Sequence, residues 1–399
     1  MSDSVFSECT ISTIQLKNRI LCSATHLAMA DEGGRPTEMM KKYYLHMAHG
    51  EVGGIIIGSA GIQQSGKSFL HRMLMIDNDQ CIDHYRDMVA AIHETSTPVI
   101  LQIAHCGRQT RSKTTGCRPE APSAIKDKFF NEEMPEELSE HGIYRIIDNF
   151  VDAVERAKKA GFDGVQLHAA HGYLLAQFLS AHMNRRKDRW GGSLENRFRI
   201  IEEIFTRTKE RVGSFPLLVK LNGHEGKKKR GMTAPEAVEI AKMLENKGCA
   251  AIEVSCGIYE DGMYVVRGNT IPVEALKSFS FKLKRVSPFL RPVAGQLARF
   301  LVKKSSPLTI YNVPDSELIK KAVSIPVIVV GGIKSIDDIT DVIAGEKADF
   351  VSMCRPFVND QLIVKKFKEQ CLKESKCIYC NYCLIAIEEQ PLKCYYGKL

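Results

Sequence analysis

The chain has 399 residues, of which 44% are hydrophobic and 26% are charged, and its formal net charge at pH 7 is +8. This composition is ordinary for a globular protein of about one to three domains, and the modest positive charge permits acidic ligands without indicating nucleic acid. The amino terminus lacks the basic and apolar regions of a secretory signal, and apolar runs such as 325–330 are too short to cross a bilayer, so we expect a cytoplasmic protein without a transmembrane segment.

Short β-branched runs alternate with amphipathic stretches along the chain. Eight runs are predicted to form strands: Arg19–Ser23, Gly54–Ser59, Val99–His105, Gly164–Ala169, Leu217–Asn222, Ala251–Ser255, Val327–Gly331 and Asp349–Met353. Five stretches between them are predicted to form helices: Gln80–Glu94, Gly142–Ala160, Leu194–Val212, Ala234–Lys247 and Ile336–Ala344. Thr233 and Ser335 are predicted N-caps, and Gly161, Gly248 and Gly345 stand where helices are expected to end.

This alternation predicts an α/β protein, a (β/α)₈ TIM barrel. The strand runs are apolar with little alternation, as expected for strands buried on both faces of a parallel sheet. A doubly wound open sheet is the alternative, but it would use fewer strands, and no G-x-G-x-x-G motif follows the first one. We expect a barrel over residues 1–370, interrupted after the sixth strand by a long excursion over 257–314, and a cysteine-rich segment over 371–399. A second long loop, 106–140, is expected to cap the cavity mouth.

Polar residues follow the predicted strands where a barrel places its active site, at the carboxyl ends. These residues are Ser23–His26, Ser59–Ala60, Gln102 and His105, His168 with His171 and Tyr173, Lys220 and Asn222, Ser255, Gly331–Gly332, and Cys354–Arg355. We expect their side chains to converge on one cavity. The glycine pair and Arg355 end the last two strands, where barrels commonly bind a phosphate, although a glycine pair can also be a tight turn.

Several of these stretches resemble the old yellow enzyme family of NADH:flavin oxidoreductases, and most closely the flavin barrel of its 2,4-dienoyl-CoA reductase and 2-enoate reductase branch. The matching stretches follow one another along nearly the whole chain, and the His168–Arg199 block is the most specific. They are LKNRI (16–20), LQIAHCGRQ (101–109), HAAHGYLLAQFLS (168–180), DRWGGSLENRFR (188–199), VVGGIKS (329–335) and SMCRPF (352–357).

The resemblance implies an FMN-dependent ene-reductase that takes electrons from NAD(P)H and reduces the C=C bond of an α,β-unsaturated carbonyl or enoyl substrate. His168 and His171 match the family's donors to the substrate carbonyl, His26 is expected to line the substrate site, and Tyr173 matches the proton donor. Two donors aimed at that oxygen stabilise the negative charge that builds on it. The expected FMN-binding residues are Ser23, Ala24, Thr25, Ser59, Ala60, Gln102, Lys220, Gly331, Gly332, Cys354 and Arg355.

Two of these positions depart from the family. Lys220 stands where arginine is frequent, which keeps the positive charge but loses the guanidinium fork. Cys354 stands where glycine is usual. Other interpretations of the catalytic residues stay open: H-x-x-H as half of a metal site, histidines that only pack, and a tyrosine that only fills the core. At the level of function, the alternatives are a flavin module that passes electrons to a partner protein and a dehydrogenase that runs in the oxidative direction.

Four of the 13 cysteines crowd the C-terminal segment, at Cys377, Cys380, Cys383 and Cys394. In a reducing compartment, such cysteines indicate metal binding or catalysis rather than disulfides. The dienoyl-CoA reductase branch has a similar segment that ligates a [4Fe–4S] cluster, although the gap between the second and third cysteines is one residue shorter here. Structural zinc and free thiols are the alternatives. No Rossmann fingerprint follows the barrel, so NAD(P)H is expected to bind over the flavin or to be replaced by another electron donor.

The excursion after the sixth strand contains a strongly basic stretch. From Ala275 to Pro314 there is no acidic residue, and the eight basic ones fall within 275–304. A solvated basic face is the usual interpretation of such a stretch. Docking of an acidic substrate, a nucleotide phosphate, a protein partner or a membrane surface are the alternatives. A second basic run, Lys227–Arg230, follows the fifth strand. The oligomeric state stays open.

Overall fold

The computed structural model describes the chain except for residues 1–2, 130–132, 227–229, 270–272, 281–282, 284–285, 302–305 and 399. The side chains of Asp3, Gly262, Met263 and residues 298–301 are also outside the description. The undescribed residues therefore include Lys227–Lys229 of the second basic run and five of the eight basic residues within 275–304: Lys282, Lys284, Arg285, Lys303 and Lys304.

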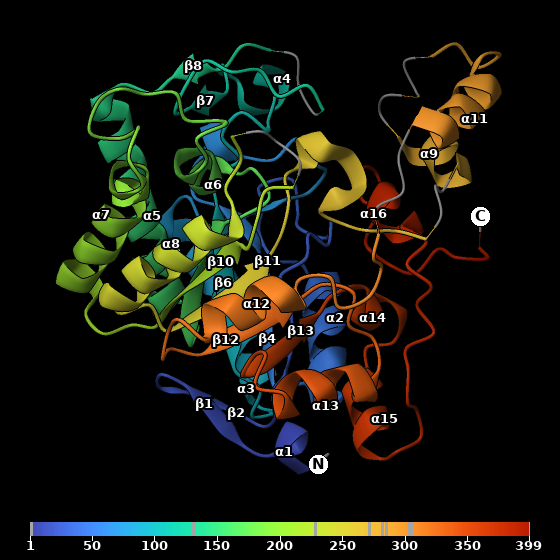
Figure 1. The fold of residues 1–399 in the computed structure, drawn as a ribbon. Helices are drawn as coiled ribbons and strands as arrows, with labels where there is room; N and C mark the ends of the chain where they lie inside the picture. Colours follow the sequence, from blue (N-terminus) through green and yellow to red (C-terminus); the bar gives the residue numbers. More distant parts are fainter. Residues whose placement is uncertain are drawn as a thin grey trace.

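All eight predicted strands are present, and they form one closed parallel barrel (Figure 1). Neighbouring strands pair in parallel around the barrel, and the last strand returns to the first. In barrel order the strands are β3 (Ile20–Cys22), β4 (Gly54–Gly61), β6 (Val99–Ala104), β9 (Gly164–Ala169), β10 (Leu217–Asn222), β11 (Ala251–Ser255), β12 (Val327–Val330) and β13 (Phe350–Met353). The predicted (β/α)₈ barrel is confirmed, and the predicted strand ends are right to within two residues.

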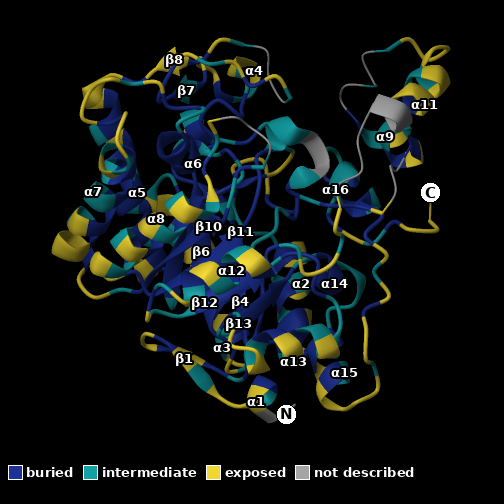
Figure 2. Ribbon diagram, in the orientation of Figure 1, coloured by how far each residue is buried: buried dark blue, intermediate teal, exposed yellow. Residues whose placement is uncertain are grey.

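Helices surround the barrel and bury their apolar faces against it (Figure 2). The five predicted helices are α3 (Ile82–His93), α5 (Glu140–Lys159), α7 (Leu194–Val212), α8 (Ala234–Asn246) and α13 (Ile336–Ala344). Thr233 and Ser335 cap α8 and α13 as predicted, and Gly161 and Gly248 follow helix ends with φ of 89° and 80°. The prediction missed α2 (Glu38–His49) and α12 (Val313–Lys320). After β13 the chain continues through two short helices, α14 (Arg355–Asn359) and α15 (Ile363–Lys368).

A short hairpin closes the amino-terminal end of the barrel. It consists of β1 (Cys9–Ile11) and β2 (Ile14–Leu16), paired antiparallel. Its Ile11, Ile14 and Leu16 pack against barrel residues such as Ile100 and Ile328 in a separate apolar cluster. This apolar plug fills one end of the barrel, so a polar cavity has room only toward the opposite end.

The two long excursions lie at the carboxyl end of the barrel. Residues 106–140 contain α4 (Ser112–Thr115), β7 (Glu120–Ala121) and β8 (Glu136–Glu137), and residues 257–314 contain η3 (Tyr259–Tyr264), α9 (Val273–Phe279) and α11 (Arg291–Leu301). The helices α9 and α11 pack on each other and stand off from the barrel (Figure 1). The remaining short elements are α1 (Asp3–Phe6), η1 (Gln64–Gly66), β5 (Leu74–Met75), η2 (Asp79–Cys81), α6 (Leu174–Leu179) and α16 (Tyr382–Ala386). None of the helices in the described part of the chain has the length and hydropathy needed to span a bilayer.

Candidate active site

An open cavity lies at the carboxyl ends of the strands, with about 1030 Å³ of empty space that includes the part open to solvent. Residues on or directly after all eight strands line it. It is lined by most of the residues that the sequence analysis selected: Ser23, Ala24, Thr25, His26, Ser59, Gln102, His168, His171, Tyr173, Lys220, Gly331, Gly332, Cys354 and Arg355. Ala60 does not line it. The Ala60 side chain is fully buried in the apolar core, because neighbouring residues of a strand point to opposite faces.

The walls of this cavity include segments that the sequence analysis did not select. None of the cavity-lining residues in the described part of the chain comes from 106–140. The walls instead include Tyr259 and residues 265–266 from the excursion after β11, and Tyr379, Leu384 and Ile387 from the C-terminal segment. Arg108 of that loop pairs with Glu260 of the later excursion over 2.9 Å, and the capping role of 106–140 stays a prediction.

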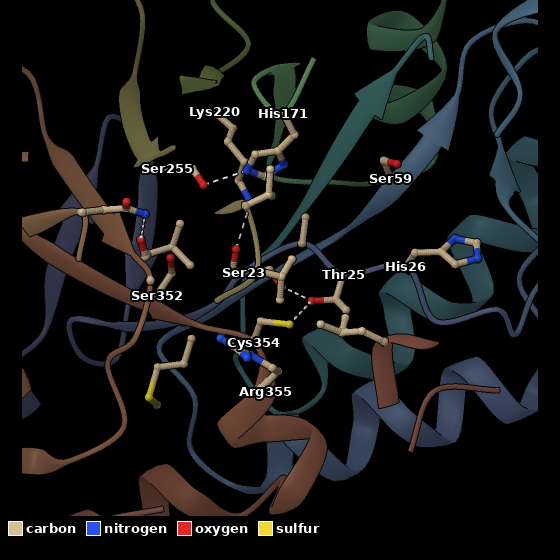
Figure 3. A pocket seen from close by; sticks show the side chains of 18 of the residues that line it. Ser23, Thr25, His26, Ser59, His171, Lys220, Ser255, Ser352, Cys354 and Arg355 are labelled. Atoms are coloured by element: carbon tan, nitrogen blue, oxygen red, sulfur yellow. Dashed lines mark hydrogen bonds between the residues drawn. The ribbon is translucent and has the colours of Figure 1, made fainter. Parts of the chain in front are cut away.

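A network of buried polar side chains lies under the cavity, inside the barrel. At its centre is Glu253 on β11, which is fully buried. The Glu253 carboxylate accepts hydrogen bonds from Ser23 Oγ and Ser352 Oγ at 2.7 Å each and from Gln166 Nε2 at 2.8 Å. Lys220 Nζ lies 3.2 Å from Glu253 Oε2 and donates to Ser23 Oγ over 2.9 Å, an arrangement that Figure 3 shows in part. Burial alone would raise the pKa of Glu253, but the Lys220 charge and these donors hold it below its usual value.

The network continues to the cavity wall through Gln102. Gln102 Nε2 donates to Gln166 Oε1 over 2.7 Å, and Gln102 lines the cavity beside Lys220. Gln166 and Glu253 were missed in the sequence analysis. Both interrupt strand runs that are otherwise apolar, and a charged residue is almost never fully buried unless it is paired. That interruption was the signal that could have identified them.

Two imidazoles and a phenol stand together on one side of the cavity. The rings of His168 and Tyr173 have centroids 4.5 Å apart, and those of His168 and His171 are 5.1 Å apart. His168 Nδ1 accepts from the backbone N–H of Ala170 over 3.3 Å, so the proton of the neutral ring is on Nε2. His171 Nε2 lies 2.7 Å from Ser255 Oγ (Figure 3). His171 is thus held toward β11, and the two imidazoles do not have equivalent environments.

These side chains are uncharged near neutral pH. Burial lowers the pKa of His171 to about 3, with a further contribution from Lys220. Burial and the neighbouring His171 hold the pKa of His168 well below its usual value. Burial and nearby Tyr259 raise the pKa of Tyr173 well above its usual value. The site therefore offers neutral N–H and O–H donors rather than cations or a phenolate.

Tyr259 is a second phenol at the site that the sequence analysis missed. It begins η3, its ring centroid lies 6.2 Å from those of both His171 and Tyr173, and its hydroxyl is hydrogen-bonded to that of Tyr173. A backbone bridge between His171 and Ile258 holds the two segments together. Because η3 belongs to an excursion rather than to a strand end, no strand-end rule pointed to this residue.

The opposite end of the cavity has a buried positive charge and open backbone. Gly331 and Gly332 follow β12 with φ of 130° and 74°, and a Cβ on Gly332 would lie 2.4 Å from the carbonyl oxygen of Leu308. Arg355 donates from Nη1 to Arg267 O and to Asn381 Oδ1, at 2.7 Å each, and lies 4.3 Å over the Tyr379 ring. No carboxylate within the described residues forms an ion pair with Arg355, so its charge is available to an anion.

Two further cavity residues hold each other in place. Thr25 Oγ1 donates to Cys354 Sγ over 2.9 Å, as Figure 3 shows. His26 Nε2 lies 2.8 Å from the carbonyl oxygen of His71, and burial lowers the pKa of His26 to about 4. The Cys354 thiol is part of the cavity wall.

The four C-terminal cysteines line a second, smaller cavity of about 390 Å³, and Arg355 lines both cavities. Asn359 Nδ2 lies 3.7 Å from Cys394 Sγ. Burial raises the pKa values of Cys377, Cys380 and Cys383, so these thiols hold their protons. Within the described residues, no three Cys, His, Asp or Glu side chains converge closely enough to hold a single metal ion.

The larger cavity fits FMN by the chemistry of its donors. One end presents a carboxamide and an ammonium group, which suit the hydrogen-bonding edge of an isoalloxazine ring. The other end presents a buried guanidinium, which has no anionic partner in the described part of the chain, and a glycine pair after a strand, which suit a phosphate. Among the residues that the structure describes, the buried Tyr379 hydroxyl at that end also has no hydrogen-bond partner, so it can donate to an anion.

Comparison with known proteins gives the family. Residues 4–275 match the model of the NADH:flavin oxidoreductase / NADH oxidase family. The chain is 35% identical over 380 residues to the NADH oxidase of Thermoanaerobacter brockii, which covers 94% of this chain and 52% of that protein. It is 31% identical over 394 residues to a metal reductase of Desulforamulus reducens, covering 98% of this chain and 53% of that protein. The chain thus spans about half the length of these curated relatives.

Solved structures agree in fold. A complex of 2-naphthoyl-CoA reductase superposes with a TM-score of 0.82 at 22% identity, covering 100% of this chain and 57% of that one. The old yellow enzyme homologue from Zymomonas mobilis superposes with a TM-score of 0.74 at 24% identity, covering 98% and 99%. At these identities the likeness shows the fold alone. The family match and the curated relatives establish that the chain belongs to the NADH:flavin oxidoreductase / NADH oxidase family, the old yellow enzyme family.

Proposed function

We propose that this protein is an FMN-dependent ene-reductase that uses electrons from NAD(P)H to reduce the C=C bond of an α,β-unsaturated carbonyl or enoyl compound. The observation that supports this most is the grouping of His168, His171 and Tyr173 as neutral donors in a cavity whose two ends suit FMN. Bound FMN would supply a hydride to the alkene carbon remote from the carbonyl.

The residues of the chain would then act on the substrate. His168 donates from Nε2 to the carbonyl oxygen, where negative charge builds as the alkene accepts the hydride. His171 is the second donor, and Ser255 sets the direction of its ring. Tyr173 delivers a proton to the alkene carbon next to the carbonyl, and its raised pKa keeps that proton available. The Tyr259 hydroxyl supports Tyr173 through their hydrogen bond.

We also propose that Cys377, Cys380, Cys383 and Cys394 hold a [4Fe–4S] cluster. Their common cavity supports this, because four thiolates are the usual ligand set of such a cluster. A zinc ion needs its sulfur ligands to converge at about 2.3 Å from one point, whereas a cluster is a body of several atoms that fills a cavity. Arg355 joins the two cavities, so a cluster would lie beside the phosphate end of the flavin site. In that position the cluster could pass electrons from a redox partner to the flavin.

Anaerobic stopped-flow measurements on the purified protein test the proposed reaction. NAD(P)H should reduce the bound flavin, and a panel of enones, enoates and enoyl-CoA esters should reoxidise it. Reduction by NAD(P)H without reoxidation by any alkene would indicate the electron-transfer module instead. Reduction of the flavin by an amine or a saturated compound would indicate a dehydrogenase. Release of FAD, or no flavin after reconstitution, would refute the cofactor assignment.

A further inference from the structure

The polar network under the cavity has a direction that the chemistry of its members fixes. The Glu253 carboxylate has only acceptor atoms, so the Gln166 amide must turn its Nε2 toward Glu253. The Gln166 oxygen then faces the other way, and only the Nε2 of Gln102 can pair with it. The orientation of Gln102 at the cavity wall therefore follows from a carboxylate two side chains away.

We propose that Glu253 is a positioning residue for the flavin, which orients Gln102 through Gln166 and offsets the charge of Lys220. The proposal rests on the proposed function, because it takes FMN as the ligand. Because Gln102 Nε2 is bound to Gln166, the other atom of the Gln102 amide, Oε1, is left as a hydrogen-bond acceptor. The pyrimidine half of an isoalloxazine ring presents an N–H group between two carbonyl groups, and that N–H needs an acceptor.

The charge balance at the Lys220 end of the cavity differs from that at the Arg355 end, where a phosphate would bind. The side chains of Lys220 and Glu253 are 4% and 0% exposed, and their charged atoms lie 3.2 Å apart. Two buried opposite charges at this distance largely cancel for a group placed beside them. Lys220 therefore acts with much less than a full positive charge. Arg355 at the other end has no such partner in the described chain. Charge near a flavin ring tunes its electronic properties, so Glu253 should lower the FMN midpoint potential.

A purely structural role for Glu253 gives a different expectation. The network joins Ser23, which follows β3, to residues on β9, β11 and β13. If it only ties these strands together, its loss should lower thermal stability and leave the FMN potential unchanged. The midpoint potential therefore separates the two roles.

The deciding variant is Glu253→Gln. Its amide oxygen can take the place of Oε2 and accept from Gln166, and its amide nitrogen can face the hydroxyls of Ser23 and Ser352, which can turn to accept. The shape and the direction of the network then survive while the charge is lost. We expect reduced FMN to gain at least tenfold in affinity relative to oxidised FMN, which is a shift of about +30 mV for a two-electron couple. Reductive titration against a reference dye measures it.

A second variant, Gln166→Leu, breaks the orienting contact and keeps the Lys220–Glu253 pair. We expect the Kd for FMN to rise about tenfold, the loss that one net hydrogen bond gives. Adding Gln102→Leu should change that Kd little further, because the effect acts through Gln102. The matched control is Glu225→Gln, another buried carboxylate just after a barrel strand. Glu225 is bound by Ser180 Oγ and the Met232 N–H, and it does not line the cavity, so the FMN potential should stay at the parent value.

The outcomes are distinct. A Glu253→Gln protein with the parent potential would overturn the charge role, and a Gln166→Leu protein with the parent Kd would overturn the orienting role. If Glu253→Gln does not fold, Gln166→Leu alone decides whether the network orients Gln102. If the parent protein takes up no FMN, the proposed function fails and this inference fails with it. If the parent binds FMN and reduces alkenes while both variants match it, only this inference fails.

Discussion

The two cavities that meet at Arg355 are built in different ways. The polar groups of the larger one stand on strand ends and are held by a buried network, so their positions do not depend on a ligand. The cysteine cavity lies in a segment whose one helix in the described chain, α16, has five residues, and burial keeps its thiols protonated. The difference indicates that the fold preorganises the proposed flavin site, whereas the proposed cysteine site would gain its charge only when a cluster binds.

The largest effect is expected at the preorganised site, for Tyr173→Phe. The variant keeps the ring and removes the proton donor, so alkene reduction should slow by about 10²–10⁴-fold while flavin reduction by NAD(P)H is spared. Separate stopped-flow half-reactions measure both rates. Tyr259→Phe, which leaves the Tyr173 hydroxyl in place, should cost less. An unchanged rate for every alkene substrate of Tyr173→Phe would refute the proton-donor role.

Arg355→Gln should have the next largest effect, because it changes the residue that both cavities share. Loss of a charged hydrogen-bond donor costs about 1.5–3 kcal/mol, so the Kd for FMN should rise by about 10- to 100-fold. Fluorescence titration with FMN measures it. Lys334→Gln is the matched control, since Lys334 lies 5.9 Å over the same Tyr379 ring but does not line the cavity. Equal losses in both variants would show that Arg355 acts through the ring alone.

Cys380→Ser and Cys383→Ser should remove the proposed cluster and leave the FMN cavity intact. We expect iron to fall from about four atoms per chain to near zero, while the Kd for FMN changes by less than about threefold. Iron and sulfide analysis after anaerobic purification, with an FMN titration, tests both parts. Cys371→Ser is the control, because Cys371 is an exposed thiol of the same segment that does not line the cavity. A parent protein without iron would leave the segment as an ordinary cap.

The smallest effect concerns pH. The pKa of His171 is about 3 in the folded chain and about 6.5 in an unfolded one, so between these values only the unfolded chain binds the proton. This contribution to the free energy of unfolding is complete above about pH 6.5 and is lost as the pH falls toward 3, by about 1 kcal/mol per pH unit. Urea unfolding at pH 7 and pH 5 measures the loss. His171→Gln should reduce it, and the exposed His84→Gln should not; equal losses in both would contradict the assignment.

The barrel and most of the cavity wall could be predicted from the amino-acid sequence alone. Apolar strand runs that alternate with amphipathic helices admit few arrangements, and parallel strands bring their carboxyl ends to one edge. Residues as distant in sequence as Ser23 and Arg355 could therefore be assigned to one cavity. The rule says at which end of a strand the site lies, but not which of two neighbouring side chains faces it. Ala60 was therefore placed in the wall although it faces the core.

The pairing of these side chains, in contrast, became visible only in the folded chain. Glu253 and Gln166 lie in different strands, and nothing local to either strand shows that their polar groups meet in the barrel interior. Tyr259 and Tyr379 reach the cavity from segments without a regular period, so their positions depend on packing between distant parts of the chain. Periodicity in a sequence reports which face of an element is buried, whereas the partner of a buried polar group is set by the fold as a whole.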